Sequence, residues 1–411
     1  MKRFKIVIGI VVLILLAFAV SKGFKSAETS KSNVEQKLTK AQQLKAKEYA
    51  FKQIKLKKSV AAYFEKAIQA DVIVGAGVSI VQGDSILISG GFGKRKSDEK
   101  NKIDEETIFR IGSLSKGFGG VLTASFQAEH KLNWNDKITD YIPEFQLGDS
   151  ANTAKITVSH LLSHSSGAPY HSFTNLVEAN LPIADIVKRF HEVKPQNKPG
   201  LQYSYQNAMF ALSQEVLHKV SGQDVKTLLQ NRFFTPLGMS TVSMNHESLI
   251  KNKNVAMPHA KGNKGWRTLP LRDRYYNAVV AGGINASAND MAKWMRLLMG
   301  HKPEVLKKEV IAEVFKPMIA LRDNNKYYQR WPGHLQSHYG FGWRIHKFQD
   351  VDDKKEFTIW HHGGSVNNFR NEIAIFPEVD IGICVLLNGN SKLASTVIPD
   401  LYTLVKEHLN P

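Results

Sequence analysis

Cysteine is almost absent from this chain of 411 residues. The single one, Cys384, stands in the apolar run 381–387, and one cysteine cannot form a disulfide bond within the chain. Without a cysteine near its N-terminus the chain also cannot be a lipoprotein. A thiol inside an apolar strand usually packs as a small hydrophobic side chain. We therefore expect Cys384 to be buried and to have no catalytic role.

Acidic residues are fewer than basic ones. The chain has 37 Asp and Glu and 55 Lys and Arg, which gives a formal net charge of +18. The excess is concentrated in residues 1–58, where 14 Lys and Arg stand against 3 Glu, a difference of +11. The rest of the chain carries only +7, and no zinc-finger or RNA-recognition motif accompanies it. This distribution argues against a nucleic-acid partner. It favours a basic segment beside anionic lipid head groups, which attract each nearby cation by about 1 kcal/mol.

The N-terminus begins with the basic stretch 1–5 and continues with apolar residues and glycine over 6–20. This is the pattern of an export signal. As a helix the run rises about 22 Å, less than the ~30 Å hydrocarbon core of a bilayer, so residues 1–24 are either a cleaved signal peptide or a membrane anchor. Residues 25–58 contain neither proline nor glycine and predict a basic stalk or linker helix. We expect an exported, periplasmic or otherwise extracytoplasmic protein, in contact with the membrane through residues 6–20 if they are retained.

Residues 59–411 have the patterning of a globular domain. Apolar strands flank a turn at 82–84 near the start, and a second pair flanks 377–380 near the end. The segment between them has mostly helical periodicity, and residues 395–409 predict a terminal helix. These features predict an α+β fold: an antiparallel sheet flanked by N- and C-terminal helices, with an inserted helical lobe at roughly 120–300.

The first motif with chemical meaning is Ser113-Leu-Ser-Lys116. A serine hydroxyl is a weak nucleophile until a base takes its proton, and a lysine three residues on lies one helical turn away on the same face. Burial lowers the pKa of a lysine and makes a neutral amine available. The same spacing recurs at 97–100 and 248–251, but both of these segments are charged and solvated. Only the motif at Ser113 is set among glycine and apolar residues.

Two further motifs follow along the chain. After a Pro-Gly turn at 199–200 comes Tyr205, a phenol that beside a lysine can be held as phenolate or can shuttle a proton, and then Asn207, whose amide can bind a substrate. A similar pair at 275–277 lacks the preceding turn. The run 361–365, His-His-Gly-Gly-Ser, follows a strand-like segment, where glycines let a substrate backbone approach and a following N–H can face an oxyanion.

Two histidines, His160 and His164, have the helical spacing of metal ligands. No carboxylate or third ligand accompanies them in the sequence. We therefore expect neither a metal nor a cofactor.

In this order the motifs resemble those of the serine β-lactamase and penicillin-binding-protein superfamily. The match is to its class C β-lactamase-related branch, which includes D-alanyl-D-alanine carboxypeptidases, D-aminopeptidases and esterases. The resemblance covers roughly residues 60–408 and implies a β-lactamase/transpeptidase-like fold. It extends to shorter sequence segments outside the motifs, among them Leu132-Asn-Trp-Asn-Asp136, Pro236-Leu-Gly-Met239, Ala281-Gly-Gly283 and Tyr339-Gly-Phe-Gly-Trp343.

The resemblance implies a role for each motif residue. Ser113 is the residue that is acylated, and Lys116 is its activating partner. Tyr205 acts as general base or proton shuttle, and Asn207 positions the substrate. The peptide N–H groups of Ser113 and Ser365 form the oxyanion hole.

His362, Gly363 and Gly364 stand where the β-lactamases have Lys-Thr-Gly, although the neighbouring His361 is an alternative match for the lysine. A histidine with an ordinary pKa near 6.5 is mostly neutral at pH 7 and binds a carboxylate less well than lysine does. This weakens the case for a dedicated β-lactamase. It also predicts that affinity for substrates with a carboxylate rises as the pH falls through about 6.5.

The expected function is therefore that of an exported serine hydrolase. It forms an acyl-enzyme on Ser113 and hydrolyses an ester or amide, such as a small molecule, a D-amino-acid peptide of the cell wall or a β-lactam. An alternative is a catalytically weak penicillin-binding or peptidoglycan-binding protein, or a sensor, on the same fold. A membrane-surface adaptor built on residues 25–58 is a third possibility. The sequence predicts no particular oligomeric state.

Overall fold

The computed structural model describes residues 40–322, 325–352 and 354–409. The chain divides into two compact units, residues 1–54 and 55–411. In the first unit, residues 40–54 are the start of helix α2 (Lys40–Gln69), and residues 42–54 are exposed apart from the half-buried Gln53. The predicted signal or anchor lies outside the described residues. Among those described, no helix combines the length and hydropathy that crossing a bilayer needs.

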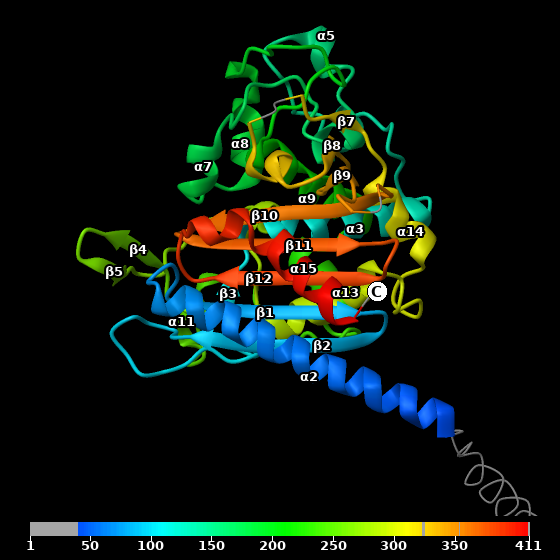
Figure 1. Ribbon diagram of the computed structural model, residues 1–411. Helices are drawn as coiled ribbons and strands as arrows, with labels where there is room; N and C mark the ends of the chain where they lie inside the picture. Colours follow the sequence, from blue (N-terminus) through cyan, green and yellow to red (C-terminus); the bar gives the residue numbers. More distant parts are fainter. Residues whose placement is uncertain (1–39, 323–324, 353, 410–411) are drawn as a thin grey trace, which may run out of the picture. The chain divides into compact units, whose positions relative to one another are not determined.

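The second unit is built on one antiparallel sheet of eight strands in the order β2-β1-β12-β11-β10-β9-β8-β7 (Figure 1). Strands from both ends of the chain meet in it, because β1 pairs with β12. Both predicted hairpins are confirmed, as β1–β2 and as β11–β12. The strands are β1 Gly75–Gln82, β2 Ser85–Gly93, β7 Ile319–Ala320, β8 His334–Tyr339, β9 Arg344–Gln349, β10 Glu356–Val366, β11 Phe369–Phe376 and β12 Ile381–Leu387.

Strand β12 shows how the sheet separates two cores, because successive side chains point to opposite faces. Ile383 and Val385 pack in one core with Val60 and Phe64 of α2, and α15 (Val397–Leu409) covers the same face. Cys384 lies in the other core. It is buried, as expected, and burial raises the pKa of its thiol.

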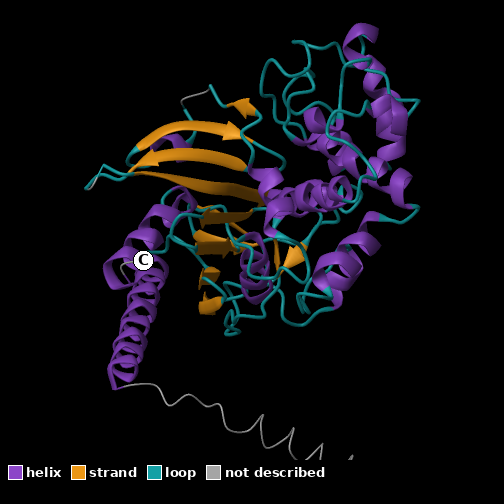
Figure 2. Ribbon diagram, turned by 90° about the vertical axis from the view of Figure 1, so that its right-hand side faces the viewer, coloured by secondary structure: helices purple, strands orange, loops and turns teal. Residues whose placement is uncertain are grey.

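The predicted terminal helix is therefore confirmed as α15, and the helical lobe lies across the sheet from it (Figure 2). On the lobe side α13 packs on β1, β2 and β12. The α-helices between α2 and α15 are α3 Ser115–Ala128, α4 Ile138–Tyr141, α5 Ser150–Thr153, α6 Val158–Leu162, α7 Thr174–Glu178, α8 Ile183–Arg189, α9 Asn207–Ser221, α10 Val225–Leu229, α11 His246–Lys251, α12 Val279–Gly282, α13 Ala288–Leu298 and α14 Lys308–Ala312.

Short elements connect these parts. A π-helical turn at Gln230–Phe234 follows α10. Two small sheets pair β3 with β6 and β4 with β5. Their strands, with the 3₁₀ turns, are β3 Phe109–Arg110, β4 His259–Gly262, β5 Gly265–Thr268, β6 Asn285–Ala286, η1 Gly112–Leu114, η2 Phe190–Glu192, η4 Glu313–Phe315, η5 Tyr327–Arg330 and η6 Lys392–Ser395.

Helix α3 lies against the turn between β8 and β9 because two of its positions have no side chain. A Cβ at Gly117 would lie 2.6 Å from the ring of Trp343, and one at Gly120 would overlap the carbonyl oxygen of Phe341. Phe118 stacks on Trp294 of α13 with 3.9 Å between ring centres. Helical glycines cost about 1 kcal/mol each relative to alanine. Here they allow the close packing that fixes the N-terminal turn of α3.

Candidate active site

Ser113 stands at a sharp turn between β3 and α3. Gly112 before it has a φ of +56°, a left-handed conformation that glycine adopts without strain. A Cβ at Gly112 would lie 3.0 Å from the backbone nitrogen of Ser365. The backbone of the serine turn therefore lies directly against strand β10. Ser113 is half-buried, and its side chain lies close enough to the phenol of Tyr205 to lower the pKa of that phenol.

Lys116 follows in the first turn of α3 and is fully buried. Its Nζ donates to Oδ1 of Asn207 and to the carbonyl oxygen of Ala281, both at 2.7 Å, and lies 4.8 Å from the ring centre of Tyr205. Burial, with a smaller effect of the charge of Arg344, holds the pKa of Lys116 well below its ordinary value. A neutral amine uses two N–H groups in these two hydrogen bonds and keeps a lone pair that can accept a proton.

Tyr205 lies between the serine turn and the lobe, and its ring packs on His164 with 4.2 Å between ring centres. Burial raises its pKa to about 12, although the nearby side chain of Ser113 acts in the opposite direction. The phenol therefore keeps its proton at neutral pH. Of the two roles left open by the sequence, this favours the proton shuttle over the stored phenolate.

Asn207 begins helix α9 and holds Lys116 in place. Its Oδ1 accepts from Lys116, and its Nδ2 donates to the hydroxyl of Tyr275 at 3.2 Å. That hydroxyl lies 3.4 Å from Oε1 of Glu178 and donates to it. Because two neighbours fix the amide, only one N–H of Asn207 stays available for a substrate in the described structure.

Strand β10 brings the His-His-Gly-Gly-Ser run to the site, and its alternation separates the two histidines. His362 lies on the side of Tyr205, with 6.4 Å between ring centres, and its Nε2 is 2.9 Å from the hydroxyl of Tyr339. His361 points to the opposite face, where Nε2 lies 2.8 Å from Oε2 of Glu372. His362 is therefore the histidine beside the candidate site.

The charge expected on His362 is a point where the structure corrects the sequence interpretation. The ring is 1% exposed. Burial, followed by the charges of Arg344 and Lys116, lowers its pKa well below 6.5. His362 thus remains neutral at and well below pH 6.5. The expected rise in carboxylate affinity through pH 6.5 therefore loses its physical basis, because burial moves the titration of His362 to lower pH.

The glycines of β10 give the strand room to approach its neighbours. A Cβ at Gly364 would overlap the carbonyl oxygen of Ile111, and one at Gly363 would lie 2.7 Å from the hydroxyl of Tyr327. Gly364 therefore faces the serine turn, whereas Gly363 faces the other side of the sheet. The next residue, Ser365, is exposed. The strand edge is open where Ser113 meets it.

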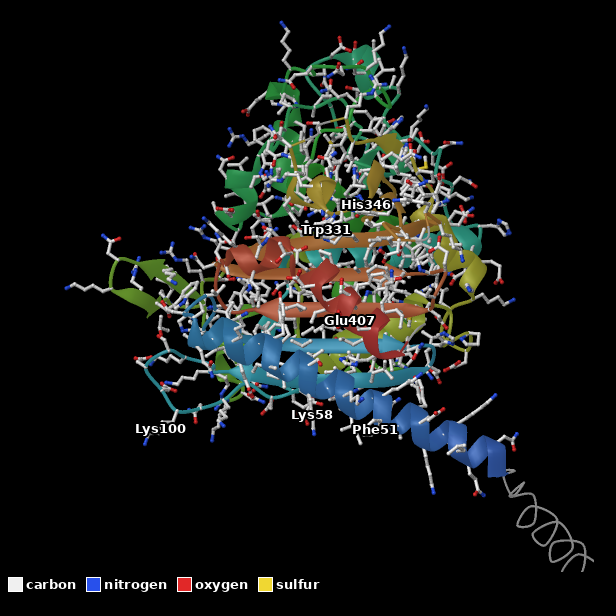
Figure 3. All side chains as sticks on the ribbon, viewed as in Figure 1. Phe51, Lys58, Lys100, Trp331, His346 and Glu407 are labelled. Carbon is white, nitrogen blue, oxygen red and sulfur yellow. The ribbon has the colours of Figure 1, made fainter. Side chains whose placement is uncertain are left out.

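The two other Ser-x-x-Lys segments lie in different surroundings. Oγ of Ser97 is 3.2 Å from Oγ1 of Thr268, and Lys100 is exposed (Figure 3). Lys251 is exposed as well and forms an ion pair with Glu247. Neither lysine is desolvated as Lys116 is.

Sequence reasoning missed two residues of the site. Tyr275 belongs to the Tyr-Tyr-Asn segment that was set aside for lacking a turn, yet its hydroxyl bonds to Asn207. Arg344 directly follows the Tyr339-Gly-Phe-Gly-Trp343 phrase. Its Nε and Nη1 are buried without a hydrogen-bond partner, and its charge lowers the pKa of Lys116. That phrase was a signal that could have drawn attention to Arg344.

The histidines with metal-ligand spacing have other contacts. Nδ1 of His160 accepts from the backbone N–H of Thr157 at 3.1 Å. His164 is buried, and its Nδ1 accepts from the backbone N–H of Gln206 at 3.2 Å. Within the described ranges, no group of three His, Cys, Asp or Glu side chains is arranged to hold a metal ion.

A model of the Beta-lactamase family matches residues 60–404. Protein flp of Staphylococcus aureus (strain MRSA252) is 24% identical over 350 residues, which cover 84% of this chain and 65% of that protein. The unguisins hydrolase ungD' of Aspergillus campestris is 23% identical over 334 residues, covering 79% of this chain and 59% of that protein. The chain thus spans less than two thirds of the length of these relatives.

Two solved structures have a similar fold. The octameric penicillin-binding protein homologue from Pyrococcus abyssi has a TM-score of 0.71 and 23% identity, covering 85% of this chain and 78% of that one. EstCE1, a hydrolase with promiscuous acyltransferase activity, has a TM-score of 0.72 and 17% identity, covering 86% of this chain and 99% of that one. Likeness at this level of identity concerns the fold, and it confirms the predicted architecture.

Proposed function

The chain belongs to the Beta-lactamase family, and on that premise we propose that it is a serine hydrolase that forms an acyl-enzyme on Ser113. One observation carries the proposal. The side chain of Ser113 lies close enough to the phenol of Tyr205 to lower its pKa, next to a fully buried lysine whose own pKa is held well below its ordinary value. A surface serine with a solvated lysine, as at 97–100, offers no such base.

Acylation begins with removal of the serine proton. Oγ of Ser113 attacks the carbonyl carbon of an ester or amide while its proton passes through the hydroxyl of Tyr205 to the amine of Lys116. Tyr205 receives one proton as it gives up another, which suits a phenol whose pKa is about 12. The carbonyl oxygen becomes an oxyanion in this step. The peptide N–H groups of Ser113 and Ser365 are the proposed donors to it.

Collapse of the tetrahedral intermediate breaks the bond to the leaving group, which takes the proton back from Lys116 through Tyr205. A water molecule then attacks the acyl-enzyme and gives up a proton along the same path. Collapse of the second tetrahedral intermediate then breaks the bond to Oγ, releases the acid and returns that proton from Lys116 through Tyr205 to Oγ, which regenerates the Ser113 hydroxyl. General acid–base catalysis of this kind contributes about 10²–10⁴-fold in rate.

The comparisons support hydrolysis as the reaction class, because one relative is named a hydrolase and one structural neighbour is described as a hydrolase with acyltransferase activity. The neutral His362, where the resemblance predicts a lysine in β-lactamases, favours an ester or peptide over a β-lactam as substrate. A small acyl ester or a D-amino-acid peptide of the cell wall is our proposed substrate class.

The test is labelling of the full chain with a neutral fluorophosphonate, followed by mass spectrometry and by assays with p-nitrophenyl esters, D-Ala-D-Ala peptides and nitrocefin. We expect one label, on Ser113, and loss of labelling and turnover in Ser113→Ala. Ser97→Ala and Ser248→Ala are matched controls from the two other Ser-x-x-Lys segments and should behave as wild type. Labelling without turnover of any substrate would replace the hydrolase by the binding or sensing alternative.

Export and contact with the membrane are a separate part of the proposal, supported by the basic start and apolar run of residues 1–20. Fractionation of a bacterial host that expresses the full chain should place the protein outside the cytoplasm. The mass of the N-terminal peptide then distinguishes a cleaved signal from a retained anchor. Recovery of the uncleaved chain from the cytoplasm would contradict this part.

A further inference from the structure

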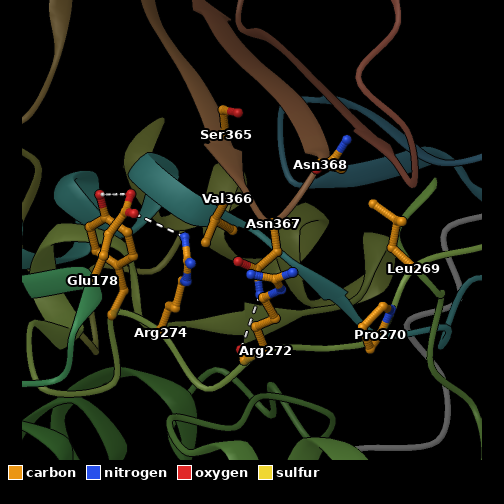
Figure 4. A pocket seen from close by; sticks show the side chains of 10 residues that line it. Glu178, Leu269, Pro270, Arg272, Arg274, Ser365, Val366, Asn367 and Asn368 are labelled. Atoms are coloured by element: carbon orange, nitrogen blue, oxygen red, sulfur yellow. Dashed lines mark hydrogen bonds and ion pairs between the residues drawn. The ribbon is translucent and has the colours of Figure 1, made fainter. Parts of the chain in front are cut away.

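A cavity of about 380 Å³ opens beside Ser365, between the loop that follows β5 and the turn that joins β10 to β11 (Figure 4). Tyr275, which also lines it, accepts a hydrogen bond from Asn207. The cavity is therefore lined by the strand edge beside Ser113 and by the tyrosine that bonds to the amide holding Lys116. A substrate whose carbonyl reaches Ser113 has room to place one end in this cavity.

The charges that line the cavity do not balance. Its one carboxylate, Glu178, forms an ion pair with Arg274, with 2.9 Å between Nη1 and Oε2, and these two charges cancel (Figure 4). A second cation, Arg272, also lines the cavity and is exposed. The cavity thus carries a net positive charge that comes from Arg272.

The backbone of Arg272 is fixed, whereas its guanidinium is free. Its carbonyl oxygen accepts from Nη1 of the buried Arg110 at 2.8 Å and from Nδ2 of Asn367 at 3.0 Å. Within the described part of the chain, its guanidinium forms no hydrogen bond or ion pair. The adjacent Asp273 carries a carboxylate but does not line the cavity. The guanidinium of Arg272 is therefore available to bind a ligand in the cavity, while the backbone that carries it is held in place.

The remaining lining is apolar on one side and amide on the other. Leu269, Pro270 and Val366 supply the apolar wall. Asn367 and Asn368 form the two-residue turn between β10 and β11, with φ of +46° and +66°, and their side chains also line the cavity. A short hydrocarbon chain that ends in a carboxylate matches this combination of apolar wall, amides and one free guanidinium.

We propose that this cavity binds the carboxylate end of an anionic substrate and that Arg272 is the residue that determines this specificity. The inference rests on the proposed acylation of Ser113 and names the substrate class of that same site. His362 does not take this role because it is neutral and hydrogen-bonded to Tyr339. Arginine suits the task because its planar guanidinium binds a carboxylate through two parallel hydrogen bonds.

The experiment compares two six-carbon esters, p-nitrophenyl hexanoate and the mono-p-nitrophenyl ester of adipic acid, which differ by a terminal carboxylate. The readout is the ratio of their kcat/KM values, corrected for the rate with Ser113→Ala. We expect wild type to prefer the anionic ester and Arg272→Gln to lower the ratio about tenfold, the loss of one charge-assisted pair. Arg272→Lys should restore part of it, and added salt should reduce it in wild type.

The matched control is Arg267→Gln, which removes the same charge from the exposed β4–β5 hairpin, outside the cavity. It should leave the ratio unchanged. An unchanged ratio in Arg272→Gln, or loss of the preference in Arg344→Gln alone, would overturn the inference while the acyl-enzyme proposal stands. Turnover or fluorophosphonate labelling that persists in Ser113→Ala, or the absence of both in wild type, would instead refute the acyl-enzyme proposal and this inference with it.

Discussion

Replacing Gly364 by alanine tests whether the close approach of β10 to the serine turn matters for catalysis. The added Cβ would overlap the carbonyl oxygen of Ile111 and lie 2.7 Å from Cδ1 of Leu114, whereas ordinary contacts begin at 3.4 Å. The carbonyl is backbone in a buried turn and cannot rotate away. The strand and the turn must therefore separate by about 1 Å, and a misplacement of this size costs about 10²-fold in rate.

The separation acts on the two proposed oxyanion donors, because Gly364 directly precedes Ser365 and Ile111 lies two residues before Ser113. We expect Gly364→Ala to lower kcat for a p-nitrophenyl ester about 100-fold, or about 2.7 kcal/mol of transition-state stabilisation. Overpacking should also lower the free energy of unfolding by about 1–3 kcal/mol.

Steady-state kinetics and thermal unfolding measure the two effects. The control is Gly90→Ala in β2, where an added Cβ meets nothing within 4 Å, and it should keep the wild-type kcat. If Gly364→Ala kept both the wild-type kcat and the wild-type Tm, the backbone of the serine turn and that of β10 would not form one catalytic unit, and the oxyanion-hole assignment would have to be abandoned.

Three further predictions concern buried groups. Burial holds the folded-state pKa of Lys116 well below its ordinary value of 10.5. Between the folded and the unfolded pKa of this lysine, the free energy of unfolding should therefore rise with pH by up to about 1.4 kcal/mol per unit. Lys116→Met should abolish this slope, measured by denaturant titration, and should also abolish turnover. Burial outweighs the nearby Arg370 and raises the pKa of Glu372 from 4.5 to about 7. Its protonated form therefore stabilises the fold below pH 4.5, and this stability, about 3 kcal/mol, is lost as the pH rises through 7. Between pH 5 and 8 the free energy of unfolding, measured by denaturant titration, should therefore change less favourably in wild type than in Glu372→Gln, by up to about 3 kcal/mol. Tyr275→Phe removes one hydrogen bond to Asn207 and should lower kcat about 5-fold, the equivalent of about 1 kcal/mol; an unchanged kcat would separate Tyr275 from the positioning of Lys116.

The strands of the two terminal hairpins and the terminal helix could be predicted because their patterns are local. The turns at 82–84 and 377–380 each stand between two apolar runs, and both hairpins are present in the structure. Strands at both ends of the chain predicted one sheet built from both ends, and in the structure β1 pairs with β12. The short helices of the lobe were predicted only as a region, because segments of four to seven residues, such as α4 and α8, contain too few turns for a clear periodicity.

Some residues of the candidate site could be predicted from the sequence, and others could not. Ser113 and Lys116 were found because they stand three residues apart in an apolar setting that is visible in the sequence. Tyr205 was found through its motif, but the choice between phenolate and proton shuttle depended on burial. Tyr275 was set aside because its local pattern was incomplete, and its hydroxyl reaches Asn207 only through the folding of a distant loop.

What the sequence by itself determined is thus the two terminal hairpins, the resemblance of the motifs and the identity of the candidate nucleophile, since each depends on spacing along the chain. Only the tertiary structure decided which of two adjacent histidines lies beside Tyr205, and that His362 is buried and neutral there. It also brought Arg272 and Ser365, 93 positions apart in the chain, to the same cavity. Burial and the free charge of a cavity depend on contacts between residues far apart in the chain, and spacing along the sequence carries no record of them.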